Sequence, residues 1–187
     1  MESSTVTEFA ANNLLVRRAT QADAETIVDV HIRSWQWAYR GIIADTYLGS
    51  LGLPDVRRRR LEQRRQALEA PPHGQREWVA EWPGRVVGIA GTGPSRDKDA
   101  TPATGEVLAI YLEREAAGHG VGRALLKHIV DDLRQQGYTE ATLWVLDGNT
   151  RARRFYEAAG WHPDGETKMD ERPGATLHEV RYHTHLA

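Results

Sequence analysis

The segment AAGHGVGRALLKHIVDDLRQQG, residues 116–137, decides the fold of this chain. Glycines stand at alternate positions in it, at Gly118, Gly120 and Gly122, and an amphipathic helix pattern follows directly. Apolar residues recur every four positions along that helix, at Val121, Leu125, Ile129 and Leu133. Glycine loses more conformational freedom on folding than any other residue. Its repeated use where a helix begins therefore needs a reason.

A short apolar run, EVLAIYL at 106–112, precedes the glycines and is typical of a central strand. A strand that runs through a glycine-rich turn into a helix presents free backbone N–H groups and a positive dipole end at one point. This arrangement predicts a bound anion, most often a phosphate, although a tight turn that binds nothing stays open. Gly122 is followed by Arg123 and Ala124, which excludes a nucleotide P-loop. The spacing G-x-G-x-G, late in the chain, is also weak for a dinucleotide fingerprint.

Composition indicates an ordinary soluble protein. The 187 residues are 40% hydrophobic and 27% charged with a net charge of −2, so no basic field favours nucleic acid or an anionic membrane. The absence of cysteine excludes disulfides and thiolate catalysis. We expect a flexible tail at 1–13, without the features of a signal peptide, and a single domain at 14–187 in the cytoplasm.

The remaining patterns predict alternating strands and helices. Strands are expected at 14–20, 76–82, 85–93, 106–112, 140–146 and 175–186. Helices are expected at 21–39, from about 45 to 70, from 121 to 136 and at 149–160. Pro83 and Gly84 predict a hairpin between the second and third strands. The order favours a mixed α/β sheet with helices on both faces.

A second segment, LWVLDGNTRARRFYEAAGW at 143–161, narrows the interpretation. Together with the glycine segment it resembles the GNAT superfamily of acetyl-CoA-dependent N-acetyltransferases. The family pattern N-x-x-A-x-x-F-Y-E-x-x-G is matched at Asn149, Ala152, Phe155, Tyr156, Glu157 and Gly160. Trp161 follows where Phe is commoner, and Ala117 stands where the family has Arg or Gln before its glycine turn. Since the family's loop works mainly through backbone amides, the departure at Ala117 implies weaker anchoring of the cofactor at most, and not loss of the site.

The resemblance implies acetyl-CoA as co-substrate, no metal, and a GNAT-like sheet of about six to seven strands whose splayed strands form the coenzyme A tunnel. Main-chain groups of Ile110, Tyr111 and Leu112 would hold the pantetheine arm. The loop Gly118, His119, Gly120, Val121, Gly122 and Arg123 would hold the pyrophosphate. Asn149, also a good N-cap, and Tyr156 would contact the arm and its sulfur.

For chemistry, the resemblance implies that Tyr156 donates to the departing thiolate, although its helical spacing also suits a core residue. Glu106 is a candidate general base, and strand alternation predicts that it shares a face with Leu108, Ile110 and Leu112. It could equally be a solvated strand end. His31, which would titrate near neutrality, and a bound water are the other candidates.

Trp35 and Tyr39 lie four residues apart on the first helix and could wall a pocket for an amine, although core packing explains them as well. This stretch resembles many bacterial small-molecule members of the family. The expected reaction is acetylation of a small primary amine by direct attack in a ternary complex. Acetylation of a protein N-terminus or lysine, and a non-catalytic acyl-CoA-binding module, are the alternatives. A homodimer is compatible with the sequence.

Two other features favour simpler interpretations. The arginine-rich run at 57–66 is interrupted by Glu62 and lacks aromatic residues, so we interpret it as a solvated helix face and not a nucleic-acid site. His183 and His185 share a strand face near His178, but no spaced carboxylate or cysteine completes a site. We therefore predict no metal.

Overall fold

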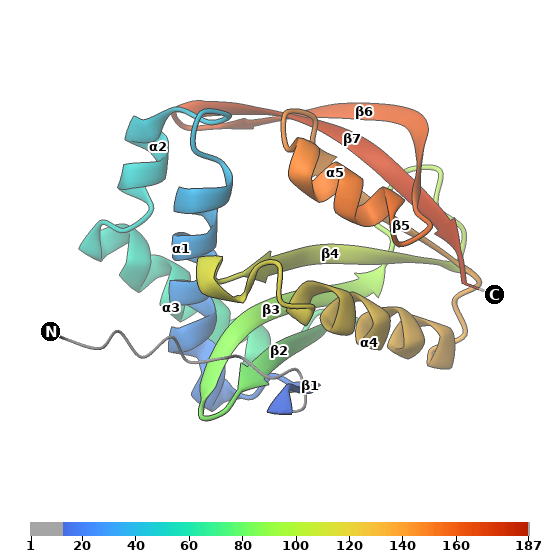
Figure 1. Cartoon of the computed structure of the whole chain (residues 1–187), viewed down its shortest axis with the longest axis horizontal. Coiled ribbons are helices and arrows are strands. Elements are labelled where there is room, and N and C mark those ends of the chain that lie inside the picture. The colour runs from blue at the N-terminus through green and yellow to red at the C-terminus, as the bar shows by residue number, and fades with distance from the viewer. Residues whose placement is uncertain (1–12, 187) are drawn as a thin grey trace, which may run out of the picture.

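The computed structural model describes residues 13–186, which form a seven-stranded sheet in the order β1-β2-β3-β4-β5-β7-β6 (Figure 1). The strands are β1 (Leu15–Arg18), β2 (Arg76–Trp82), β3 (Arg85–Pro94), β4 (Thr104–Leu112), β5 (Glu140–Leu146), β6 (His162–Arg172) and β7 (Ala175–His185). Only β4 and β5 pair in parallel, and every other neighbouring pair is antiparallel. Almost all of the predicted tail, residues 1–12, lies outside the described residues.

Two groups of helices cover the two faces of the sheet. They are α1 (Ala24–Ala38), α2 (Asp45–Ser50), α3 (Pro54–Glu69), α4 (Val121–Gln135) and α5 (Thr150–Glu157). The first three lie on one face and α4 and α5 on the other (Figure 1). The predicted stripe of α4 is buried, with Leu125, Ile129 and Leu133 fully enclosed. No helix within residues 13–186 is both long and apolar enough to cross a membrane.

The structure confirms the mixed sheet and the hairpin at Gly84, and it differs from the sequence prediction in two elements. The helix predicted from about residue 45 is divided into α2 and α3, because Pro54 occupies the first turn of α3 and ends the preceding segment. Strand β6 was not predicted. Its residues are nearly all exposed, at an edge of the sheet, so they carry no apolar alternation.

The sheet opens between β4 and β5. Their pairing runs only from Thr104 opposite Glu140 to Val107 opposite Leu143, although β4 continues to Leu112 and β5 to Leu146. The carboxyl halves of the two strands therefore separate, as expected for a tunnel. The helices that follow these strands, α4 and α5, begin beside the opening.

An irregularity in β4 changes which side chains share a face. The pairing with β3 shifts between Gly91, opposite Ala109, and Thr92, opposite Val107, so Leu108 is an extra residue. Val107 consequently packs into the same core as Ile110 and Leu112, against α4. The prediction that Glu106 shares the face of Ile110 and Leu112 is wrong, because the bulge interrupts the alternation.

Candidate active site

The geometry of the turn requires glycine at all three positions, for two different reasons. Gly118 and Gly120 adopt φ values of 88° and 84°, in the left-handed region that other residues disfavour. A Cβ on Gly122 would lie 3.1 Å from Leu112 Cδ1, so this glycine allows α4 to approach β4 closely. A Cβ on Gly118 or Gly120 would meet no atom within 4 Å. The turn therefore leaves open space in front of the first amides of α4, where an anion can bind.

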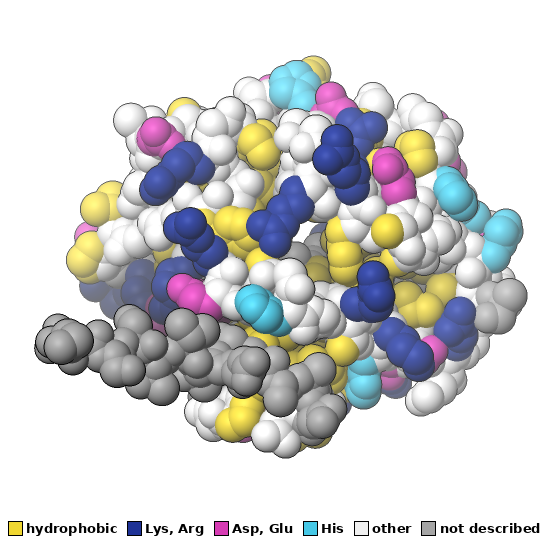
Figure 2. Space-filling view, in the orientation of Figure 1, with side chains coloured by type: hydrophobic (Ala, Val, Ile, Leu, Met, Phe, Trp, Pro, Cys, Tyr) yellow, Lys and Arg dark blue, Asp and Glu magenta, His cyan; other side chains and the backbone are white. Residues whose placement is uncertain are grey.

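A cavity of about 430 Å³ occupies the opening between β4 and β5. Of the residues predicted to bind the cofactor, it is lined by Ile110, Tyr111, Leu112, Gly118, Gly120, Gly122, Arg123, Asn149 and Tyr156. His119 and Val121 do not line it, because Val121 is in the core and the ring of His119 lies 6.1 Å from that of Trp82. In the space-filling view, Lys and Arg side chains surround a hollow near the centre of the molecule (Figure 2).

Tyr156 lies at the wall of this cavity with 7% of its surface exposed. Its ring packs against Phe155 at a centroid distance of 5.2 Å, and its hydroxyl makes no hydrogen bond to any residue within 13–186. Burial raises the pKa of Tyr156 above its usual value near 10. The phenol is therefore protonated at neutral pH and can donate a hydrogen bond into the cavity.

Asn149 lines the same cavity and begins α5. Its Oδ1 accepts a hydrogen bond from the backbone N–H of Ala152 at 3.1 Å, which confirms the predicted capping role. This bond fixes the start of α5, and hence the position of Tyr156 two turns along the helix.

Arginines that sequence reasoning missed surround Ala117. An adjoining cavity of about 470 Å³ is lined by Trp37, Arg40, Arg114, Ala117 and Arg151. The guanidinium of Arg151 lies 4.8 Å from the ring centroid of Trp37. These arginines come from three separate segments, so no motif spacing could have revealed them. They supply positive charge next to the position where the resemblance implies an Arg or Gln.

Glu106, the predicted base, is held in an ion pair. Arg96 donates from its Nη2 to one carboxylate oxygen at 2.6 Å and from its Nε and backbone N–H to the other, at 3.1 and 3.0 Å. Glu106 is 2% exposed, whereas the Arg96 side chain is 60% exposed. Glu106 lines neither the cavity between β4 and β5 nor the cavity on the face of the sheet that α1 covers. Glu106 is therefore not a solvated strand end. Both of its carboxylate oxygens already accept hydrogen bonds from Arg96.

A third cavity, of about 250 Å³, lies on the face of the sheet that α1 covers. We call it the acceptor-side cavity; α1, α3 and strands β2, β3, β4 and β6 contribute to it. Trp35 lines this cavity, whereas Tyr39 lines the cavity between β4 and β5, and their rings meet edge to face at 4.9 Å. Tyr111 lines both cavities. The two predicted acceptor residues therefore lie at the boundary between the cavities.

His31 stacks on Tyr111 with a centroid distance of 4.8 Å and lines the acceptor-side cavity. Burial, followed by the positive charges of Arg60, Arg64 and Arg172, lowers the pKa of His31 to about 3. The prediction that His31 titrates near neutrality is therefore wrong. The imidazole is neutral at physiological pH and is a poor candidate for a general base.

Replacing His31 by Asn should reduce the loss of unfolding free energy that occurs as the pH falls. The folded pKa of about 3 lies below the unfolded value of 6.5, so between these values the unfolded chain binds a proton that the folded chain does not. At pH values above the unfolded pKa, His31 therefore does not lower the free energy of unfolding. As the pH falls below that value, His31 lowers it progressively. The slope from one group is at most about 1.4 kcal/mol per pH unit.

Urea unfolding at about pH 7.5 and about pH 5 checks this prediction, because one proton linkage changes the difference between the two proteins. We expect the free energy of unfolding of the wild type to decrease relative to that of His31→Asn at the lower pH. An equal difference at both pH values would show that His31 is not held neutral.

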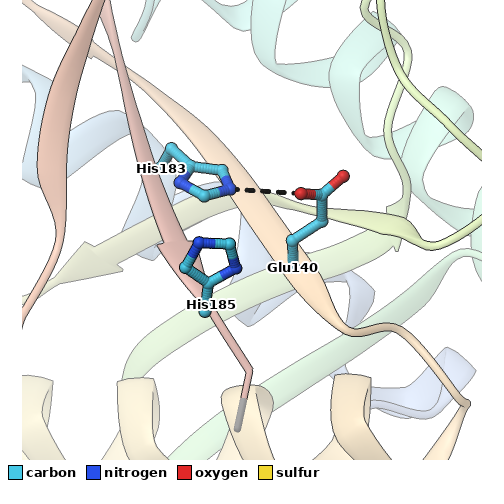
Figure 3. Close-up of side chains that lie close together, drawn as sticks. All are labelled: Glu140, His183 and His185. Carbon is cyan, nitrogen blue, oxygen red and sulfur yellow. Dashed lines mark hydrogen bonds and ion pairs between the residues drawn. The ribbon is translucent and has the colours of Figure 1, made fainter.

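A histidine cluster lies at the other end of β5 from Asn149. Glu140 stands beside His183 and His185, and a distance of 3.3 Å separates His183 Nε2 from a Glu140 carboxylate oxygen (Figure 3). The second Glu140 oxygen accepts a hydrogen bond from Thr104 at 2.5 Å. The premise that no carboxylate accompanies these histidines is wrong, since strand pairing places Glu140 directly opposite His185. None of these three residues lines any of the three cavities.

Comparison with known proteins agrees with this geometry. The model of the acetyltransferase (GNAT) family matches residues 31–161, which include the glycine turn, Asn149 and Tyr156. The chain belongs to the GNAT family. A relative from Bacillus subtilis, the uncharacterized N-acetyltransferase YuaI, is 34% identical over 165 residues, covering 88% of this chain and 89% of the relative. This acetyltransferase is therefore an acetyl-CoA-dependent acyltransferase.

Solved structures share the fold. The PaiA N-acetyltransferase of Thermoplasma acidophilum, in complex with coenzyme A, has a TM-score of 0.67 at 19% identity and covers 92% of this chain and 98% of its own. YncA of Salmonella typhimurium, solved with its cofactor acetyl-CoA, has a TM-score of 0.67 at 21% identity, covering 94% and 95%. At these identities the likeness concerns the fold alone.

Proposed function

We propose that this acetyltransferase transfers the acetyl group of acetyl-CoA to the primary amine of a small molecule, by direct attack in a ternary complex. The observation that supports this most is the acceptor-side cavity, which shares Tyr111 with the cavity in the splayed sheet. Its volume of about 250 Å³ lies just below the usual range for small-molecule sites and suits a small acceptor.

Coenzyme A would bind with its pyrophosphate on the first amides of α4, where Gly118 and Gly120 leave open space. Arg114 and Arg151 would then neutralise phosphate charge in place of the side chain missing at Ala117. The pantetheine arm would pass between β4 and β5 along the main chain of Ile110–Leu112. In this pose the thioester reaches the part of the cavity that Tyr39, Tyr111 and Tyr156 line.

In the reaction, the free amine nitrogen attacks the thioester carbonyl, the new N–C bond forms, and the C–S bond breaks as the thiolate leaves. Tyr156 donates a hydrogen bond to the developing negative charge on sulfur. Its raised pKa favours a hydrogen bond over complete proton transfer, because a thiol, with a pKa near 8.5, holds its proton less tightly than this phenol. Glu106 remains the proposed acceptor of the amine proton, but only through a water molecule, because its buried carboxylate lines neither cavity.

Thiol release from acetyl-CoA tests this proposal. The panel holds small primary amines, peptides with a free N-terminus, and peptides with a blocked N-terminus and one lysine. We expect release with small amines and little with either kind of peptide. Faster turnover of peptides would identify a protein acetyltransferase. Tight coenzyme binding without release for any acceptor would identify a non-catalytic binding module.

Replacing Arg114 and Arg151 by alanine should weaken coenzyme A binding by about 10-fold for each arginine, the usual size of a lost charge-assisted hydrogen bond. Calorimetry at two salt concentrations measures the change, and the dependence on salt should decrease with each substitution. Arg154→Ala is the matched control, because Arg154 is exposed on the same helix as Arg151 and lines neither cavity. Unchanged affinity in the double variant would remove both arginines from the coenzyme site.

A further inference from the structure

The arginine-rich helix α3 is not solvated on all sides. Arg58, Arg59 and Arg65 are exposed, as expected for a solvated face, but Arg60 and Arg64 are half-buried. They stand four residues apart, on one side of the helix. Arg64 lines the acceptor-side cavity; Arg60 does not line it, but its charge helps to lower the pKa of His31 inside it. The interpretation of the whole run as a solvated face is wrong for these two residues.

A third arginine approaches the cavity from β6. Arg172 lines it, and its guanidinium lies 5.4 Å from the ring centroid of Trp35. Arg172 and Arg60 are near enough to repel one another. Positive charges from α3 and from the β6–β7 hairpin, far apart in the sequence, therefore gather at one small cavity.

The carboxylates around these arginines balance only part of their charge. Glu77 pairs with Arg64, and Asp170 pairs with Arg172 at 2.7 Å. Arg60 has no ion pair among residues 13–186, so three guanidinium groups face two carboxylates and one positive charge is left over. Glu179, whose charge also acts on Tyr111, is paired with Lys168 at 3.4 Å. His31 is neutral and adds no charge.

The cavity also offers hydrogen-bond donors in excess. Arginine has donors only, and so has the indole of tryptophan. The buried Nε1 of Trp35 lies near the Tyr111 hydroxyl but has no well-aligned hydrogen-bond acceptor among the described residues. An amine that carries no anion would leave these donors and the extra positive charge unmatched, and its own ammonium form would be repelled.

We propose that the acceptor carries a carboxylate beside its amine, that Arg64 and Arg172, which line the acceptor-side cavity, bind this carboxylate, and that the unpaired charge of Arg60 attracts it. This inference rests on the proposed function and names its substrate class: small amino acids and related amino carboxylates. A carboxylate, with a single negative charge, balances the single positive charge left over, whereas a phosphate would exceed it. The amine end would then point toward Tyr111, at the boundary with the cavity between β4 and β5.

Matched pairs of acceptors test the inference. Each pair contains an amino acid and the amine left after loss of its carboxylate, such as leucine with 3-methylbutylamine, and a third arm holds aminoethyl phosphate. For wild type we expect kcat/KM to be about 10- to 100-fold higher for the amino acid, as charge-assisted hydrogen bonds allow. In Arg60→Gln the KM for the amino acid should rise at least about 10-fold while that for the plain amine stays unchanged.

Arg60 is the residue of choice because its replacement breaks no ion pair within residues 13–186, and Arg64→Gln provides the second variant. Arg59→Gln is the matched control, since Arg59 is exposed on the same helix. Calorimetric binding of the amino acid to the protein saturated with coenzyme A gives a readout independent of turnover. We expect this binding in wild type and Arg59→Gln, and its loss in Arg60→Gln.

Equal kcat/KM for amino acid and plain amine, with turnover present, would overturn this inference and leave the proposed function intact. Preference for aminoethyl phosphate would overturn the choice of carboxylate. Absence of turnover with every acceptor would count against the proposed function, and the calorimetric arm would still decide whether the cavity binds a carboxylate.

Discussion

Gly120→Glu should lower the affinity for coenzyme A by at least about 100-fold. The new side chain would extend into the open space in front of α4, since a Cβ at this position meets no atom within 4 Å. A carboxylate there would face the pyrophosphate, and two like charges about 4 Å apart repel by up to about 4 kcal/mol near a protein surface. Isothermal calorimetry with coenzyme A measures the loss.

A matched substitution separates this effect from backbone strain. Gly137 follows α4 at its other end, with a φ of 92°, and a Cβ there would also meet no atom within 4 Å. Gly137→Glu therefore imposes the same strain far from the cavity. We expect it to lower the melting temperature about as much as Gly120→Glu does and to leave the affinity unchanged. Near wild-type affinity in a folded Gly120→Glu variant would contradict the assignment of the pyrophosphate to this turn.

Tyr156→Phe should lower kcat by about 10²- to 10⁴-fold, the usual contribution of a positioned proton donor. The substitution keeps the ring packed against Phe155 and removes only a hydroxyl that bonds no described residue. Stability and coenzyme affinity should therefore change little. Single-turnover kinetics with the preferred amine measures the chemical step without interference from product release.

Tyr182 provides the control for Tyr156. It is also buried in the core, but its hydroxyl donates to Glu157 at 2.7 Å and accepts from Arg153 at 3.1 Å. Tyr182→Phe should reduce stability by about 1 kcal/mol, the usual value of one hydrogen bond, and leave kcat unchanged. If the two variants had the same kcat as wild type, Tyr156 would be a packing residue.

The sequence predicted most of the fold because its local patterns and its packing agree. The spacing of Val121, Leu125 and Ile129 on α4 indicates a buried helix face. The glycines indicate a turn whose backbone conformation only glycine adopts easily. Asn149 was predicted as a cap from residue type alone, and the structure confirms it. Strand β6 was not predicted because an exposed edge strand has no buried face, and its sequence therefore shows no alternation of apolar residues.

The candidate site was predicted less completely, for two physical reasons. Side chains from distant segments meet only in the folded chain, as Arg64 and Arg172 do at the acceptor-side cavity. In addition, a single extra residue, Leu108, reverses the alternation on which the placement of Glu106 depended. Neither the neutral state of His31 nor the ion pair of Glu106 with Arg96 leaves a signal in the spacing of residues.

A crystal structure of the protein with coenzyme A tests the central claim most directly. We expect pyrophosphate oxygens within about 2.7–3.2 Å of the first backbone amides of α4. We also expect the pantetheine arm between β4 and β5 and the thiol sulfur beside the Tyr156 hydroxyl. Coenzyme A bound away from the glycine turn, or a sulfur out of reach of Tyr156, would contradict the claim.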